Sequence, residues 1–204
     1  MILLLDGGYT SACDSKGCLE SIRQNTDEEV ISVTIKDAVD WNSVLRYLED
    51  AGAIVLAADV HMNSVPACVL RFLQKVEQAV IDGESIGGKF YAVLYTALYE
   101  GEQTSAAMEI LKNFCVHANI TWGRGLGIGG NGIKTVAKGG LKGIFWKNAS
   151  DFKMRSLQEH VMFIKERVQG EDEYVDPKRI SRGGYVRRIN HETKKNHRVK
   201  IAQN

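Results

Sequence analysis

Residues 53–75 read AIVLAADVHMNSVPACVLRFLQK and combine a strand, a loop and a helix in one short stretch. The run from Ala53 to Ala58 is apolar without interruption, which is typical of a β-strand buried on both faces. A polar loop follows at Asp59, and Pro66 suits the first turn of a helix, where an N–H group would have no partner in any case. Apolar residues then recur at helical spacing, at positions 69, 72, 73, 76 and 80. The stretch therefore predicts a strand that leads through a short loop into a core helix.

The same strand-then-helix pattern recurs on both sides of this stretch. Residues 30–35 alternate apolar and polar side chains, which is typical of an edge strand. Strands that alternate with helices indicate a parallel, doubly wound α/β sheet, here of five strands. Ligands of such sheets bind beyond the C-terminal ends of the strands, beside the point where the strand order reverses. The other expected strands are 2–5, 90–97 and one from 120, and the other expected helices are 15–25, 40–52, 103–118 and one that Ser150 caps.

The composition is ordinary for a soluble globular protein, but the charge is unevenly distributed. Hydrophobic residues make up 44% of the 204, and no apolar run approaches the ~20 residues of a membrane span. The four cysteines form neither a zinc nor a disulfide pattern, which indicates reduced thiols and a cytoplasmic protein. Residues 176–204 carry nine Lys and Arg against two acids, whereas the remainder carries 17 against 23. We therefore expect an acidic domain over 1–170 and a basic tail over 171–204.

Residues 50–75, DAGAIVLAADVHMNSVPACVLRFLQK, resemble flavodoxin-like NAD(P)H-dependent FMN reductases. Ala53 to Leu56 match the family's strand, and Pro66, Leu70 and Phe72 match the helix behind its flavin loop. WGRGLGIGGNG (122–132) is similar to the family's glycine-rich segment, and TKKNHRVK (193–200) is similar to a basic element near its end. The resemblance implies a flavodoxin-like five-stranded sheet in the order 2-1-3-4-5 with helices on both faces. It also implies bound FMN, NAD(P)H as a co-substrate and a homodimer.

The resemblance assigns three loops to the flavin. The first would hold the phosphate at the start of a helix, where backbone amides and hydroxyls suit an anion. The second would pass along the isoalloxazine ring, and the third would lie beside the ring. The expected contacts are Gly8, Tyr9, Thr10, Ser11, Ser15 and Lys16 in the first loop, Asp59, Val60, His61, Met62, Asn63 and Ser64 in the second, and Thr96, Ala97, Leu98, Tyr99 and Gly101 in the third.

Several residues depart from the family pattern at these loops. The second loop has Asp59 where the family has Pro, His61 where it has Tyr, and Met62 where it has an aromatic residue. The first loop has no arginine, and the third, TALYEGEQT (96–104), has one glycine and two acids. Two hypotheses therefore stand. The protein is an FMN-dependent oxidoreductase that takes hydride from NAD(P)H and passes electrons to a small acceptor, or it is a flavodoxin-like module with a degenerate flavin site that acts as a non-enzymatic binding protein.

Other motifs predict no chemistry of their own. GLGIGG (125–130) matches Gly-x-Gly-x-x-Gly but comes too late in the chain for a dinucleotide fingerprint, so we expect a glycine-rich loop, or a lid over 123–143. His117 and His160 have no second ligand nearby in the sequence and are expected to be surface or hydrogen-bonded residues. The pair Glu100 and Glu102 is expected to be solvated. No metal site and no catalytic side chain is predicted.

The basic tail requires a partner of opposite charge. We expect it to dock onto the acidic body of its own chain or onto a second subunit. Nucleic acid and an anionic membrane face are weaker alternatives, because aromatic residues are few and no base-reading module is present. The segment GGYVRRI (183–189) contains Tyr185, Val186 and Ile189, which would anchor the tail by burial.

Overall fold

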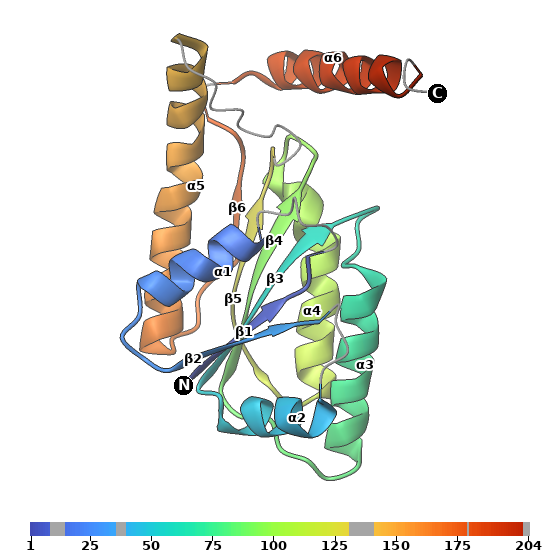
Figure 1. Ribbon diagram of the computed structural model, residues 1–204. Helices are drawn as coiled ribbons and strands as arrows, with labels where there is room; N and C mark the ends of the chain where they lie inside the picture. Colours follow the sequence, from blue (N-terminus) through green and yellow to red (C-terminus); the bar gives the residue numbers. More distant parts are fainter. Residues whose placement is uncertain (9–14, 36–39, 131–140, 179, 202–204) are drawn as a thin grey trace.

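The computed structural model describes residues 1–8, 15–35, 40–130, 141–178 and 180–201 (Figure 1). Its strands are β1 (Ile2–Asp6), β2 (Val30–Thr34), β3 (Ala53–Val60), β4 (Lys89–Thr96), β5 (Thr121–Ile128) and β6 (Glu173–Val175). Its helices are α1 (Ser15–Gln24), α2 (Trp41–Asp50), α3 (Ala67–Ile81), α4 (Ser105–His117), α5 (Leu141–Glu166) and α6 (Arg182–Ile201), with a 3-10 turn, η1 (Gly101–Thr104), before α4. No helix within these ranges is long and apolar enough to cross a membrane.

The strands form a parallel sheet in the order β2-β1-β3-β4-β5-β6. Helices α1 and α5 pack on one face, and α2, α3 and α4 pack on the other (Figure 1). The predicted doubly wound α/β sheet is therefore confirmed, with residues 30–34 at its edge. The predicted number of strands is wrong, because β6 adds a sixth strand beside β5 from residues that the sequence places in the tail.

Strand β6 is held by tertiary contacts that no local sequence pattern reveals. Asp172 lies directly before it, and its Oδ1 accepts hydrogen bonds from the Gly125 amide at 2.7 Å and from Trp122 Nε1 at 3.0 Å. Its Oδ2 lies 2.6 Å from Nζ of Lys112 on α4. A single buried carboxylate thus ties the segment to β5 and α4, and three residues of strand carry no periodicity that would predict it.

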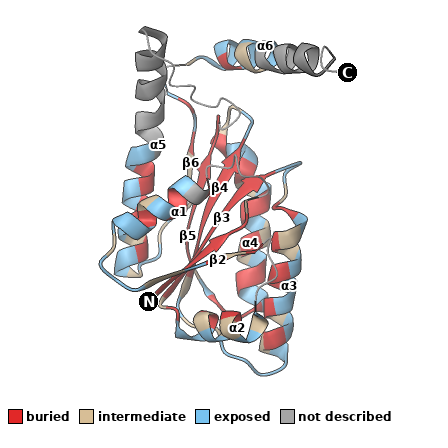
Figure 2. Cartoon of the chain, in the orientation of Figure 1, coloured by how far each residue is buried: buried red, intermediate tan, exposed pale blue. Residues whose placement is uncertain are grey.

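The central strands are buried along almost their whole length (Figure 2). Successive side chains enter opposite core layers, with Leu3 and Leu5 under α2, α3 and α4, and Ile2 and Leu4 under α1 and α5. Full burial of one such side chain contributes about 1.5–3 kcal/mol. The uninterrupted apolar runs of these strands follow from this two-sided burial.

Two expectations about the second half of the chain are wrong. The glycine-rich segment is part of strand β5 rather than a loop or lid, since a Cβ atom on Gly123 would lie 2.4 Å from the Tyr91 ring and one on Gly125 would lie 2.4 Å from Met108 Sδ. Residues 131–140 of the expected lid lie outside the described residues. Helix α5 begins at Leu141, so Ser150 lies inside it and does not cap it. A serine is compatible with a cap and with a helix interior, so the sequence leaves this start undetermined.

Candidate functional site

Three loops leave the sheet at the edge where its strand order reverses. Strand β1 pairs with β2 on one side and with β3 on the other, so the chain crosses over between β1 and β3. Ligands of doubly wound sheets bind outside the carboxyl ends of the strands at such a point. The loops that follow Asp6, Val60 and Thr96 all start at this edge, and these are the three loops that the sequence predicts for a flavin.

The loop after β3 is a tight two-residue turn. The backbones of His61 and Ser64 exchange two hydrogen bonds of 3.0 Å, and Met62 and Asn63 between them have φ values of 50° and 62°. Positive φ at both central residues is the signature of a type I′ turn. The turn projects His61, Met62 and Asn63 into solvent, and the Met62 side chain is 100% exposed.

The other two residues expected in this loop belong to the strand. Asp59 and Val60 continue the pairing of β3 with Tyr95 and Thr96 of β4, and they are 7% and 7% exposed. The loop therefore begins at His61 and not at Asp59. The predicted start of the loop was wrong because an aspartate that ends an apolar run usually marks the end of a strand.

The loop after β4 presents a second exposed apolar side chain. Thr96 ends the strand, is buried, and accepts a hydrogen bond through Oγ1 from the Leu98 amide at 3.2 Å. This bond turns the chain outward, so Ala97 is exposed and Leu98 is 52% exposed. Gly101 is buried, and its amide donates to Asp176 Oδ1 at 2.7 Å. Leu98 and Met62 each lie two residues beyond the paired residues Thr96 and Val60, on adjacent loops.

The start of the basic tail packs against the β4 loop. Tyr185 is buried, donates to the Ala97 carbonyl at 2.5 Å, and contacts the Tyr99 ring edge-on at 5.6 Å between centroids. Tyr99 Oη donates to the Ile180 carbonyl at 2.7 Å, and Arg182 pairs with Glu100 at 2.5 Å. The hydrogen bond from Arg182 holds the pKa of the Glu100 carboxyl below its ordinary value.

These contacts bear on the expectations for the tail and for the acid pair. The start of the tail, up to Tyr185 in the first turn of α6, packs against its own chain through both burial and charge. Tyr185 is the buried anchor, whereas Val186 is 41% exposed. Glu100 is paired with Arg182, contrary to the expectation that it is solvated, and Glu102 is exposed as expected.

The last residue of β1, Asp6, is a carboxylate that the site predicted from the sequence does not include. Oδ1 of Asp6 accepts hydrogen bonds from the Gly8 amide and from the Ser15 hydroxyl, both at 2.9 Å. Asp6 is 6% exposed and Ser15 is fully buried. Gly8 and Ser15, two of the expected phosphate ligands, are thus already bonded to an internal carboxylate. The described part of this loop does not fit a phosphate; Tyr9, Thr10, Ser11 and the side chain of Lys16 lie outside the description.

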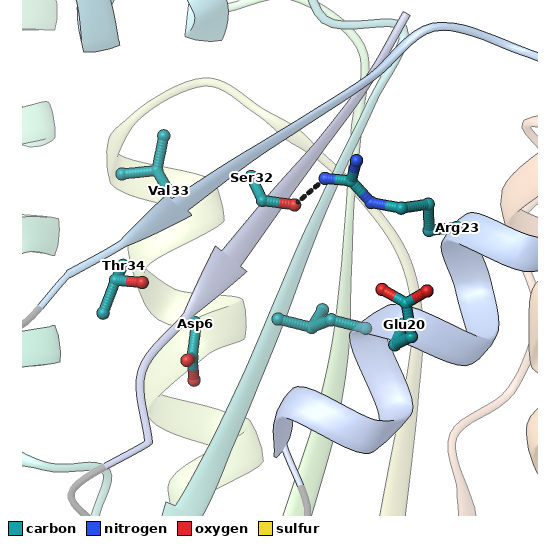
Figure 3. A pocket seen from close by; sticks show the side chains of 7 residues that line it. Asp6, Glu20, Arg23, Ser32, Val33 and Thr34 are labelled. Carbon is teal, nitrogen blue, oxygen red and sulfur yellow. Dashed lines mark hydrogen bonds between the residues drawn. The ribbon is translucent and has the colours of Figure 1, made fainter. Parts of the chain in front are cut away.

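A pocket opens beside this carboxylate, between α1 and the edge strand β2 (Figure 3). Its volume is about 490 Å³. Arg23 crosses one end of it and donates to Ser32 Oγ at 2.6 Å. The remaining lining residues are Asp6, Leu19, Glu20, Val33 and Thr34. The lining therefore combines the apolar side chains of Leu19 and Val33 with carboxylates, hydroxyls and a guanidinium.

Within the described ranges, no group of His, Cys, Asp and Glu side chains is arranged to hold a metal ion. His117 is exposed, as expected. His160 is not: it is fully buried in α5, and neither of its ring nitrogens has a hydrogen-bond partner among the described residues. It packs edge-on against Tyr91, near the start of β4, whereas the candidate loops follow the other ends of the strands.

Solved structures of several oxidoreductases match this architecture at low sequence identity. An NADH:FMN oxidoreductase matches with a TM-score of 0.60 and 10% identity, over 83% of this chain and 90% of its own. An NADPH-quinone reductase from P. pentosaceus matches with a TM-score of 0.58 and 12% identity, over 80% and 97%. An azoreductase from Bacillus anthracis matches with a TM-score of 0.57 and 11% identity, over 81% and 98%.

The chain has the flavodoxin-like fold. The fold that the resemblance implied is thereby confirmed, with β6 as an addition to the five strands expected. No protein-family model and no curated protein matches the sequence. In this flavodoxin-like sheet, the β3 loop (residues 61–64) and the β4 loop (residues 97–100) lie on adjacent strands at the switch point, and the loop after β1 lies beside them.

Proposed function

We propose that the protein is a flavin-dependent oxidoreductase that binds the flavin ring against the β3 and β4 loops. The observation that carries the proposal is the exposure of Met62 and Leu98 on adjacent loops at the switch point of the sheet. Two large apolar side chains that project into water at a ligand-binding edge suit an apolar, planar ligand. A flavin ring is a ligand of this kind.

The residues of the chain hold and orient such a ring. The thioether of Met62 is polarizable and packs well on aromatic surfaces, and the imidazole of His61 offers a second planar contact. The type I′ turn fixes both side chains relative to β3. The hydrogen bonds from Tyr185 and Tyr99 fix the β4 loop on the other side. A bound flavin would supply the redox chemistry, accepting hydride from NAD(P)H and passing electrons to a small acceptor.

The names of the similar structures support this class of reaction. One is an NADH:FMN oxidoreductase, one an NADPH-quinone reductase and one an azoreductase. NAD(P)H as co-substrate, a homodimer and a cytoplasmic location belong to the same proposal. The proposal also includes flavin contacts for the other expected residues of these two loops, Asn63, Ser64, Ala97 and Tyr99.

A second candidate function follows from the loop after β1. Because Asp6 already bonds Gly8 and Ser15, the chain has less to offer a flavin phosphate than the resemblance implies. A flavodoxin-like module that binds a partner without catalysis is the corresponding alternative. Uptake of a flavin and its reduction by a nicotinamide nucleotide separate the two candidates.

The experiment uses the full chain with added riboflavin or FMN. Under anaerobic conditions, NADH or NADPH is added and the bleaching of the flavin absorbance is followed. We expect reduction that is faster with the protein than without it. In the His61→Ala, Met62→Ala double variant the rate should fall roughly tenfold, since ring contact is lost while no core residue is touched. Ile81→Ala is the matched control, because Ile81 is an exposed apolar residue at the end of α3.

Equal rates in the double variant and in wild type would remove the β3 loop from the site. Absence of any reduction by either nucleotide, with flavin bound, would favour the non-enzymatic alternative.

A further inference from the structure

Asp6 places a carboxylate where this fold presents a helix N-terminus. Its side chain is 6% exposed, and its Oδ1 accepts from the Gly8 amide and the Ser15 hydroxyl at 2.9 Å each. Amides and hydroxyls at a helix start are the donors that an anionic ligand would use. An internal carboxylate therefore occupies, in the described part of this loop, the donors that a phosphate would need.

A second buried carboxylate lies on the same face of the sheet. Side chains alternate between faces along a strand, so Asp59 shares the face of Ala57, and Asp6 shares the face of Leu4. Leu4 and Ala57 both belong to the core layer under α1 and α5. Asp6 pairs with Ala57 across β1 and β3, and Asp59 is 7% exposed. Two buried carboxylates on neighbouring strands oppose any further negative charge at this position, where screening by water is weak.

Asp6 also lines the pocket between α1 and β2 (Figure 3). Both hydrogen bonds described above end on Oδ1, and no described residue bonds to Oδ2. A carboxylate oxygen is a strong acceptor for a hydroxyl group and cannot donate to a phosphate oxygen. The hydroxyls of Ser32 and Thr34 line the same pocket, and its guanidinium, Arg23, is already hydrogen-bonded to Ser32 Oγ at 2.6 Å. The side chains around Asp6 thus suit a hydroxylated ligand.

We propose that Asp6 makes the flavin site selective for riboflavin over FMN. The terminal hydroxyl of the ribityl chain donates to Asp6, whereas the terminal phosphate of FMN is repelled by it. This inference rests on the proposed function and reverses the expectation that the first loop reads a phosphate. Riboflavin and FMN differ only in that terminal group, so their contacts with the β3 and β4 loops cancel in a comparison.

The test is an equilibrium titration of each flavin with the full chain, followed by flavin fluorescence. Wild type should bind riboflavin at least about tenfold more tightly than FMN, because the carboxylate acts on the phosphate at short range. Asp6→Asn should raise FMN affinity at least about tenfold, because the repelling charge is removed. It should leave riboflavin affinity unchanged or lower, because the amide oxygen of Asn still accepts from Gly8 and Ser15 while its NH2 group can only donate to the ribityl hydroxyl. Glu20→Gln is the matched control; Glu20 lines the same pocket but is exposed, so solvent and salt screen it and neither affinity should change.

Each other outcome overturns the inference. FMN that binds as tightly as riboflavin, or more tightly, refutes the selectivity and leaves the proposed function standing. Binding of neither flavin refutes both. An Asp6→Asn protein that gains equally for both flavins shows that Asp6 does not read the terminal group. Thermal unfolding shows whether the Asp6→Asn protein is folded. If it is not, the comparison of riboflavin with FMN on the wild-type protein still tests the selectivity, because it needs no variant.

Discussion

Burial of His160 should make the protein sensitive to acid, and His160→Leu should remove much of that sensitivity. The imidazole is fully buried, packs edge-on against Tyr91 at 6.0 Å between ring centroids, and has no described hydrogen-bond partner on either nitrogen. Burial, with a smaller contribution from the charge of Arg124, lowers the pKa of His160 from 6.5 to about 3. A shift of this size corresponds to about 5 kcal/mol of linked stability.

The direction of this pH dependence follows from the difference in proton binding between the folded and the unfolded protein. The folded protein keeps His160 neutral down to a pH of about 3, whereas in the unfolded chain the imidazole takes up a proton below a pH of about 6.5. The contribution is therefore complete above pH 6.5 and is lost as the pH falls from there towards 3. Between pH 7 and pH 4 the loss from this one group is about 3 kcal/mol.

The assay is urea unfolding, followed by circular dichroism, at several pH values between 7 and 4. At pH 7 the variant should be as stable as wild type or more stable by about 1–3 kcal/mol, because two buried nitrogens without partners are removed. Between pH 7 and pH 4 the variant should lose about 3 kcal/mol less than wild type. His117→Leu, at an exposed position on α4, is the control and should follow wild type. A His160→Leu protein that loses as much stability as wild type over this range would show that burial of His160 does not cause the acid sensitivity.

Two further predictions concern packing. Tyr185→Ala removes the buried ring and the hydrogen bond to the β4 loop. Amide hydrogen exchange over residues 180–190 should therefore accelerate at least about tenfold, while the melting temperature of the protein changes little. Unchanged exchange would show that other contacts hold the tail. Gly125→Ala should destabilise the protein by about 1–3 kcal/mol in urea unfolding, because its Cβ would meet Met108 Sδ at 2.4 Å. Gly17→Ala is the control: a Cβ on this residue of α1 would have nothing within 4 Å, so the change should be neutral or stabilising by up to ~1 kcal/mol. Equal effects of the two substitutions would show that close packing at Gly125 does not matter.

The sequence was sufficient for the elements whose signal is local. Uninterrupted apolar runs predicted β1, β3 and β4 because both faces of these strands are buried, and helical spacing predicted α2, α3 and α4 because one stripe of each is buried. The alternating pattern of residues 30–35 predicted an edge strand, and β2 does lie at the edge of the sheet. The β3 and β4 loops could be placed at the switch point in advance, as residues 59–64 and 96–101. The structure shortens the first of them to residues 61–64.

The features that the sequence missed depend on long-range contacts. Asp6 accepts from a residue nine positions away, and Asp172 holds Gly125 and Trp122 across 47 and 50 residues. The glycines of β5 are required by Tyr91 and Met108, which lie on other elements. An aspartate after an apolar run predicted a loop at Asp59, but cross-strand pairing with Tyr95 extends β3 through it. In each case the local pattern was compatible with two structures, and a partner distant in sequence selects one.

Amide chemical shifts can show where riboflavin binds on the protein, and so whether the flavin lies at the C-terminal edge of the sheet. The labelled full chain is titrated with riboflavin, and the residues whose signals move are identified. The changes should concentrate at residues 61–64 and 97–98, with a further change at Gly8, whose amide donates to Asp6. Residues around Ile81 and Val116, exposed apolar positions at the ends of α3 and α4, should not change. An absence of shifts, or shifts confined to those helix ends, would contradict a flavin site at the C-terminal edge of the sheet.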